Sequence, residues 1–162
     1  AVVGTLSAAS ITRLQVRSLC SDWNVSADKL YQLLAVMDSV GALRIVRFQN
    51  DSKAKSAGAK LFLADPCLYA VLHGNAGSQR EAFVTALLED AGFSVHACRD
   101  ETEGDFMVLK ASGPIVREND APLKIEVGGR NKVLKKSDWV IRDGTDYPTD
   151  KVIPLWLLAM MW

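Results

Sequence analysis

The chain has 162 residues, of which 49% are hydrophobic and 23% are charged, and this composition excludes an intrinsically disordered protein. Its 19 basic and 19 acidic side chains balance, but residues 1–75 hold 8 basic and 5 acidic side chains, and residues 76–162 hold 11 and 14. The longest apolar run, residues 152–162, is too short to cross a bilayer and is interrupted by Pro154. We therefore expect a soluble globular protein in the cytoplasm, with no membrane contact.

The cysteines and histidines do not form a recognisable site. Cys20, Cys67 and Cys98 are odd in number and far apart, and His73 and His96 do not lie at ligand spacing from them. Neither a zinc site nor a disulfide framework is supported. We expect reduced, buried thiols and structural histidines.

Two helical patterns occupy residues 7–40, separated by a tight connection at residues 23–25. Ser26 is the expected N-cap of the second helix, and Gly41 is expected to end it. The apolar positions at helical spacing are Ile11, Leu14, Val16, Leu19 and Cys20 in the first pattern, and Leu30, Leu33, Leu34, Met37 and Val40 in the second.

Two strand patterns follow this helix-turn-helix. Residues 43–48 alternate in polarity, residues 49–60 form a polar loop, and residues 61–63 are typical of a returning strand. Together these elements predict a winged helix over residues 1–75. A short helix over residues 66–72 closes this domain, with Pro66 at its first position.

The second half, residues 76–162, predicts a small mixed sheet flanked by helices. Ser78 is expected to cap a helix that ends at Gly92, and another helix is expected to begin near Pro154. The expected strands are residues 93–98, 105–110, 123–127 and 139–141.

Two of these strands each carry a carboxylate, Asp105 and Glu126, which pairing in a sheet would bring to a common edge. With Glu81 in the preceding helix, the spacing resembles the PD-(D/E)XK nuclease core, and this resemblance implies a restriction-endonuclease-like sheet. It also implies that these three carboxylates hold Mg²⁺ or Mn²⁺ beside a scissile phosphate. The alternative is that they are relics of the fold, ion-paired at the end of a sheet.

The lysine of that motif is missing, because Gly128 stands two residues after Glu126. Such a lysine orients the nucleophile and stabilises charge on the phosphate, which a glycine cannot do. Arg130 and Lys132 are the nearby cations that could fold back to this place. The catalytic candidates are therefore Glu81, Asp105, Glu126 and Lys132, in a core that we expect to be degenerate.

The order of these parts resembles the C-terminal region of a widespread group of bacterial and archaeal AAA+ ATPases. In that group a P-loop module precedes a winged helix and a nuclease-like domain of unsettled role. The stretches that carry the resemblance are Leu30-Tyr31-Gln32-Leu33-Leu34, Lys60-Leu61-Phe62-Leu63-Ala64-Asp65, Arg80-Glu81-Ala82-Phe83-Val84, Gly104-Asp105-Phe106 and Glu126-Val127-Gly128-Gly129-Arg130-Asn131-Lys132. The resemblance implies an upstream AAA+ module that binds ATP, because these 162 residues contain no phosphate-cradling P-loop motif.

The winged helix could bind DNA through basic side chains in its strands and wing. The candidates for contacts with the DNA backbone are Arg44, Arg47, Lys53, Lys55, Lys60 and, on the second helix, Lys29. Base reading by that helix is poorly supported, because it also carries Asp28 and Asp38. Packing against the AAA+ module is the competing interpretation.

We therefore expect a non-catalytic accessory region of an AAA+ ATP-binding protein that binds DNA or a protein partner. A metal-dependent nuclease acting on DNA or RNA is the enzyme alternative, and a structural module for ATPase assembly is the third.

Overall fold

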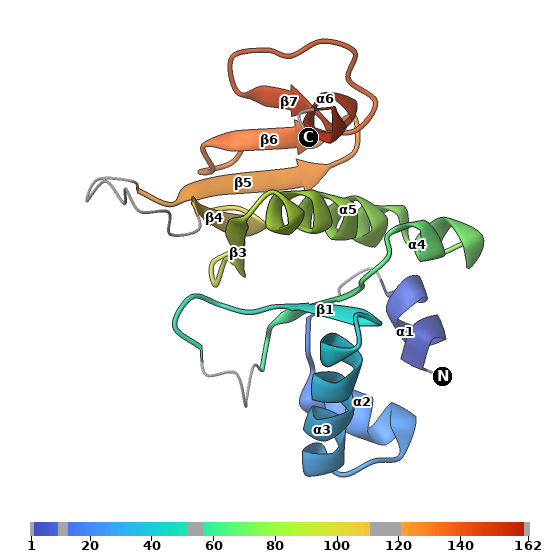
Figure 1. Ribbon diagram of the computed structural model, residues 1–162. Coiled ribbons are helices and arrows are strands. Elements are labelled where there is room, and N and C mark those ends of the chain that lie inside the picture. The colour runs from blue at the N-terminus through green and yellow to red at the C-terminus, as the bar shows by residue number, and fades with distance from the viewer. Residues whose placement is uncertain (1, 10–12, 52–56, 111–120, 161–162) are drawn as a thin grey trace. The chain divides into compact units, whose positions relative to one another are not determined.

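The computed structural model describes residues 2–9, 13–51, 57–110 and 121–160 (Figure 1). It is a mixed α/β protein, as the sequence predicts, with a two-stranded antiparallel sheet and a five-stranded mixed sheet. The chain divides into two compact units, residues 1–82 and 83–162. This division lies within the helix α5 (Ala76–Asp90) and not in the loop that precedes it. No helix in the described residues is long and apolar enough to cross a membrane.

Three helices open the first unit: α1 (Val2–Ala8), α2 (Val16–Trp23) and α3 (Ala27–Ser39). The predicted boundaries of α3 are confirmed, because the Ser26 hydroxyl accepts a hydrogen bond from the Lys29 amide and Gly41 has a left-handed φ of 70°. The helix α1 was not predicted. Leu14 was assigned to a helical pattern, but it lies in extended backbone before α2.

The strands β1 (Leu43–Val46) and β2 (Lys60–Leu63) pair antiparallel. The extended segment before α2 adds a third partner, because Arg13 forms a bridge with Lys60 and the Leu14 amide donates to the Ala59 carbonyl at 2.7 Å. All four residues of β2 are buried, so this strand lies in the core of the first unit. The helix α4 (Cys67–Val71) follows, with Pro66 at its N-cap, one position before the expected place.

The start of α5 differs from the prediction. The side-chain oxygen of Asn75 accepts a hydrogen bond from the Ser78 amide at 3.0 Å, so Asn75 caps the helix and the assignment of Ser78 as the cap is wrong. Ser78 is instead buried within the helix, and its hydroxyl donates to the Ala9 carbonyl at 2.8 Å. The helix ends as expected, with Gly92 at a φ of 83°.

The sheet of the second unit has the strand order β3-β4-β5-β6-β7. The pairs β3–β4 and β4–β5 are antiparallel, and β5–β6 and β6–β7 are parallel. The strands are β3 (Phe93–Ala97), β4 (Phe106–Lys110), β5 (Leu123–Gly128), β6 (Trp139–Arg142) and β7 (Val152–Pro154). The predicted C-terminal helix is present as α6 (Leu155–Ala159), whereas the short strand β7 was not predicted.

One face of this sheet is apolar. The register places Phe106 opposite Ile125, and both side chains are buried. Because side chains alternate along a strand, Glu126 and Gly128 share the other face of β5. The candidate acid pair therefore lies on the face opposite this core.

Candidate functional site

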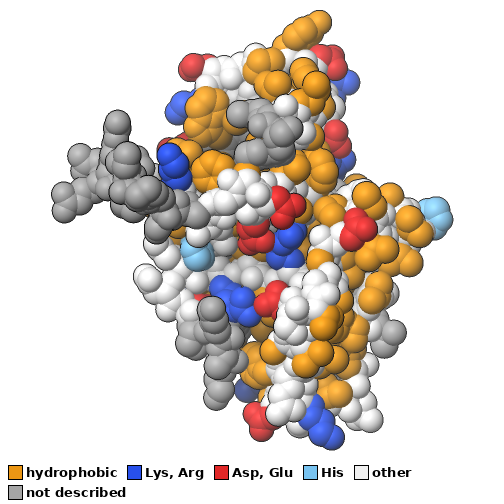
Figure 2. All heavy atoms as spheres, viewed as in Figure 1, with side chains coloured by type: hydrophobic (Ala, Val, Ile, Leu, Met, Phe, Trp, Pro, Cys, Tyr) orange, Lys and Arg blue, Asp and Glu red, His pale blue; other side chains and the backbone are white. Residues whose placement is uncertain are grey.

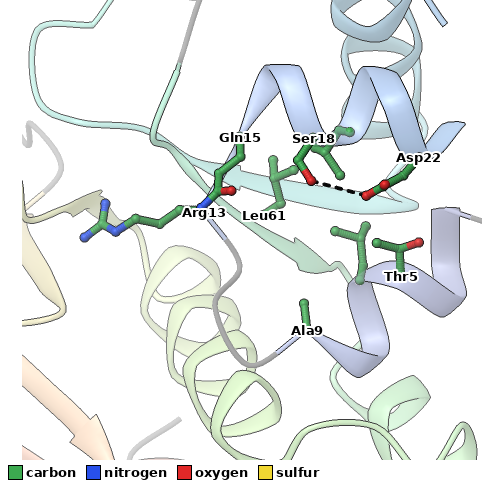
Figure 3. Close-up of a pocket in the computed structure, with 9 residues that line it drawn as sticks. Thr5, Ala9, Arg13, Gln15, Ser18, Asp22 and Leu61 are labelled. Carbon is green, nitrogen blue, oxygen red and sulfur yellow. Dashed lines mark hydrogen bonds between the residues drawn. The ribbon is translucent and has the colours of Figure 1, made fainter. Parts of the chain in front are cut away.

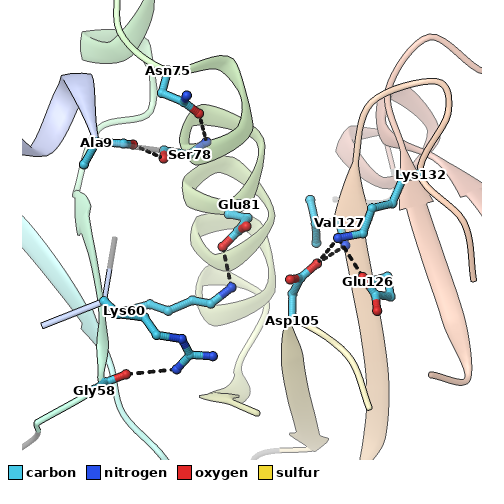
Figure 4. A network of polar contacts seen from close by, with 11 residues as sticks. Ala9, Gly58, Lys60, Asn75, Ser78, Glu81, Asp105, Glu126, Val127 and Lys132 are labelled. Atoms are coloured by element: carbon cyan, nitrogen blue, oxygen red, sulfur yellow. Dashed lines mark hydrogen bonds and ion pairs between the residues drawn. The ribbon is translucent and has the colours of Figure 1, made fainter. Parts of the chain in front are cut away.

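The structure brings Asp105 and Glu126 together at one end of the second sheet. Asp105 directly precedes β4, and its amide donates to the Ile125 carbonyl at 2.9 Å. Its carboxylate in turn accepts a hydrogen bond from the Val127 amide at 2.8 Å, which fixes the side chain against β5 (Figure 4). Antiparallel pairing is thus the reason that two residues 21 positions apart in the sequence become neighbours.

The Glu126 side chain is fully buried, with an exposed fraction of 0%. The Lys132 ammonium lies 2.7 Å from one Glu126 oxygen and 2.9 Å from an Asp105 oxygen, so it bridges the two carboxylates (Figure 4). The contact with Glu126 is short, but its direction is unfavourable for a hydrogen bond, and we describe it as an ion pair. Lys135 adds a second cation, 3.5 Å from the other Glu126 oxygen. A buried carboxylate requires such compensation.

Lys132 reaches this position by passing over Gly128. A Cβ atom at residue 128 would lie 2.7 Å from each of the Cβ, Cγ and Cδ atoms of Lys132. The aliphatic part of Lys132 therefore occupies the space that a side chain at position 128 would take. The ammonium beside the two carboxylates thus belongs to a residue four positions after Gly128 in the sequence.

The environment of Lys132 favours its charged form. Burial alone would lower its pKa, but the ion pair with Glu126 and the hydrogen bond and ion pair with Asp105 outweigh burial and raise the pKa of the ammonium above its ordinary value of 10.5. Lys132 therefore remains a cation at neutral pH. The site contains a permanent positive charge between its two acids.

The segment that carries Lys132 connects two parallel strands without a helix. We call residues 129–138, between β5 and β6, the crossover segment. The Lys135 ammonium donates to the Glu101 carbonyl at 3.3 Å, and the Lys136 amide donates to the Thr102 carbonyl at 3.3 Å. These bonds hold the crossover segment against residues 101–102, which shortly precede Asp105.

Glu81, the third expected carboxylate, has a partner within the first unit. It lies on α5 and accepts a hydrogen bond from the Lys60 ammonium at 2.6 Å (Figure 4). Lys60 is only 6% exposed, so this is a buried ion pair between β2 and α5. Within the described residues, no group of three or more acidic, histidine or cysteine side chains is placed to hold a metal ion.

The basic side chains predicted to bind DNA differ in their placement. Lys60 is buried and ion-paired, so it does not contribute to a surface of the wing. Arg47 pairs with Asp38 of α3 at 3.5 Å, Arg44 is half-buried in β1, and Lys29 is exposed in the first turn of α3. Lys53 and Lys55 lie outside the described residues.

Three large apolar side chains are exposed along α3 and at its C-cap, beside exposed polar ones. Leu33, Val36 and Val40 have exposed fractions of 36%, 58% and 69%. Their spacing of three and four residues places them in one line along the helix. Hydrophobic side chains are visible at the surface of the helical part of the first unit in Figure 2. A helix that enters the major groove would present polar side chains there instead.

A cavity of about 160 Å³ lies in the first unit between α1, α2 and β2 (Figure 3). Its wall includes Thr5, Leu61 and the hydrogen-bonded pair Ser18 and Asp22. The Arg13 guanidinium points away from the cavity and donates to the Gly58 carbonyl at 3.0 Å. The polar groups around the cavity thus bond mainly to the protein itself.

The thiols are only partly as expected. Cys98 is buried and Cys20 is half-buried, but Cys67 is exposed, so the prediction of burial is wrong for this residue. Cys67 lies in the first turn of α4, where a hydrogen bond and the negative charge of Asp65 raise the pKa of its thiol. This environment disfavours the thiolate.

Sequence reasoning missed two residues of the acid site, Lys135 and Arg142. Arg142 ends β6, and its guanidinium donates to the Lys132 carbonyl at 2.6 Å. The cluster of basic residues after Gly129 was the available signal for Lys135, whereas only the pairing of β5 with β6 places Arg142 here. Comparison of the chain with protein-family models, curated proteins and solved structures found no match.

Proposed function

We propose that the first unit is a winged helix and the second a PD-(D/E)XK-like domain. The order of helices and strands in the first unit, with the Arg13 segment paired on β2, supports the first assignment. The position of Asp105 directly before β4 and of Glu126 on the neighbouring strand β5 of a mixed sheet supports the second.

We propose that together they form a non-catalytic accessory region of an AAA+ ATP-binding protein, with nucleotide hydrolysis in the upstream module. The observation that carries the non-catalytic role is the Lys132 ammonium between Asp105 and Glu126. A magnesium ion needs oxygen ligands at about 2.0–2.1 Å in near-octahedral geometry. It would have to displace a bonded ammonium from both carboxylates, while Lys135 neutralises the remaining charge.

A cleavage assay tests this proposal. The chain is incubated with single- and double-stranded DNA and with RNA, in Mg²⁺ or Mn²⁺, beside Asp105→Ala and Glu126→Ala. We expect no cleavage above the level of either variant. Robust cleavage by the parent chain that both substitutions abolish would refute the non-catalytic role.

The accessory role requires a partner, and the line of Leu33, Val36 and Val40 favours a protein over base reading of DNA. In this proposal the apolar side of α3 packs against the AAA+ module. Val36→Glu should abolish association between the separately expressed module and this region, whereas Val71→Glu, an equally drastic change at an exposed position on α4, should not. Association that is unaffected by Val36→Glu would exclude this face.

A metal-dependent nuclease is the second candidate, and the path of Lys132 over Gly128 favours it. In this function Lys132 would do the work of the missing strand lysine, by orienting water and stabilising charge on the phosphate. Lys132→Gly would then abolish cleavage, and the double change Gly128→Lys with Lys132→Gly would restore part of it. Cleavage that persists in Lys132→Gly would exclude this role for Lys132.

A further inference from the structure

We propose that Arg142 is a positioning residue for Lys132, which holds the backbone of the crossover segment so that the ammonium stays between Asp105 and Glu126. The inference rests on the part that Lys132 plays in both proposed functions, and it requires no particular reaction. The observation that carries it is the bond from the Arg142 guanidinium to the Lys132 carbonyl.

The register of the sheet places Arg142 beside the path of Lys132. In the parallel pair of β5 and β6, Arg142 lies opposite Gly128. Residues paired in this way project from the same face of a sheet. The Arg142 side chain therefore emerges next to the bare backbone over which Lys132 passes.

Contacts to the backbone, the aliphatic chain and the ammonium then fix Lys132 along its whole length. Its amide donates to the Gly129 carbonyl at 2.9 Å, and its carbonyl accepts from Arg142 at 2.6 Å. Its aliphatic chain lies on Gly128, and its ammonium meets the two carboxylates. Of these contacts, only the one from Arg142 ties the backbone of the crossover segment to β6 at this residue.

The local chemistry of Arg142 indicates more than a gain in stability. Its Nε atom is buried and has no hydrogen-bond partner among the described residues. A buried donor without an acceptor is unfavourable, and such local conflicts are concentrated at functional sites. Arg142 nevertheless supplies a charged donor to the Lys132 carbonyl.

The Lys132 ammonium itself provides the readout. Ammonium groups held in ion pairs exchange their protons slowly enough to give a ¹H–¹⁵N signal, and loss of the signal in Lys132→Met would assign it. Lys124, which pairs with Glu103 at 2.8 Å, provides an internal reference in the same unit. In Arg142→Met we expect the Lys132 signal to be lost and the Lys124 signal to remain, and Arg142→Lys should retain both.

The matched control is Arg130→Met, the same chemical change at an exposed position of the crossover segment. It should leave both ammonium signals in place. A Lys132 signal that is unchanged in Arg142→Met would overturn the proposal. A cleavage result of either kind leaves this test unaffected.

If Arg142→Met does not fold, as loss of the Lys124 signal would show, the parent chain decides the question. The Arg142 guanidinium proton should then exchange slowly and show a scalar coupling across the hydrogen bond to the Lys132 carbonyl carbon. Fast exchange without this coupling would overturn the proposal.

Discussion

At position 128 the chain has room for no side chain, because the aliphatic part of Lys132 lies on the Gly128 backbone. Gly128→Ala would place a Cβ atom 2.7 Å from three carbons of Lys132. One of these is the Cβ atom of Lys132, which cannot move unless the Lys132 backbone moves. We expect a loss of about 1–3 kcal/mol in the free energy of unfolding of the second unit, typical of overpacking. Urea denaturation measures this loss.

A double-mutant cycle shows whether the loss comes from Lys132. In a Lys132→Gly background the colliding atoms are absent, so Gly128→Ala should cost much less than it does alone. Gly92→Ala is a poor control because its φ is positive, whereas Gly4→Ala, with no atom near the added carbon, is suitable. Equal costs in the two backgrounds would contradict the contact.

Tyr69 supplies a second prediction at the scale of single residues. Its hydroxyl oxygen accepts a hydrogen bond from the buried Leu63 amide at 3.1 Å. Tyr69→Phe leaves this amide without its acceptor, so we expect a loss of about 1–3 kcal/mol in the free energy of unfolding. Thermal or urea unfolding at neutral pH measures it.

The same residue makes stability depend on alkaline pH. Burial raises the pKa of Tyr69 above its ordinary value of 10.0. In the unfolded chain the Tyr69 hydroxyl ionises near pH 10, whereas in the folded chain it ionises only at higher pH. The contribution of Tyr69 to the free energy of unfolding is therefore fully present below pH 10 and falls as the pH rises further. The decline should be weaker in Tyr69→Phe. An identical decline in both proteins would assign it to other groups.

Single residues also show where sequence reasoning stops. The two strand patterns predicted that Asp105 and Glu126 would meet if their strands paired, and the structure shows that they pair antiparallel. Sequence reasoning named Lys132 as a candidate, but the direction of the chain after two glycines cannot be inferred from spacing. The Lys60–Glu81 pair was not anticipated, since it joins residues 21 positions apart in different elements.

At the scale of elements, the strand β2 and the helix α5 are joined by that buried pair. Glu81→Gln would leave the Lys60 ammonium buried beside a neutral group, so we expect a loss of about 3–5 kcal/mol in the free energy of unfolding of the first unit. The double change Lys60→Met with Glu81→Gln should recover much of this loss. Calorimetry of the parent chain and the variants tests the expectation, and a double variant no better than Glu81→Gln would contradict it.

Most elements were predictable, whereas the helix α1 and the strand β7 were not. The helix α3 has a good N-cap, an apolar line and a terminal glycine, so its boundaries follow from local chemistry. The cap of α5 was misplaced because Asn75 and Ser78 are both good capping residues, and only the contact of Ser78 with Ala9 decides between them. The strand β7 has three residues, too few for an alternating pattern.

At the scale of the whole molecule, the balanced net charge hides a basic first half. Any DNA binding by the first unit should therefore be electrostatic and independent of sequence. Lys53 and Lys55 fall between β1 and β2 in the sequence and outside the described residues, and Arg44 and Arg47 lie in or next to β1. Lys60 is excluded from a basic surface by its burial, so Lys53 and Lys55 are the better positions to test.

Reversing Lys53 and Lys55 to Glu should weaken binding by a similar factor on unrelated DNA sequences, and it should reduce the salt dependence of the binding constant. The matched control reverses Lys110 and Lys151, which are exposed in the second unit, so the net charge changes equally. Fluorescence anisotropy with two unrelated duplexes at several salt concentrations measures the binding constants of both double variants. A local wing surface predicts a large loss only for the first pair, whereas a general effect of net charge predicts equal losses. Tight binding to one duplex that withstands both reversals would show that sequence is read by other residues.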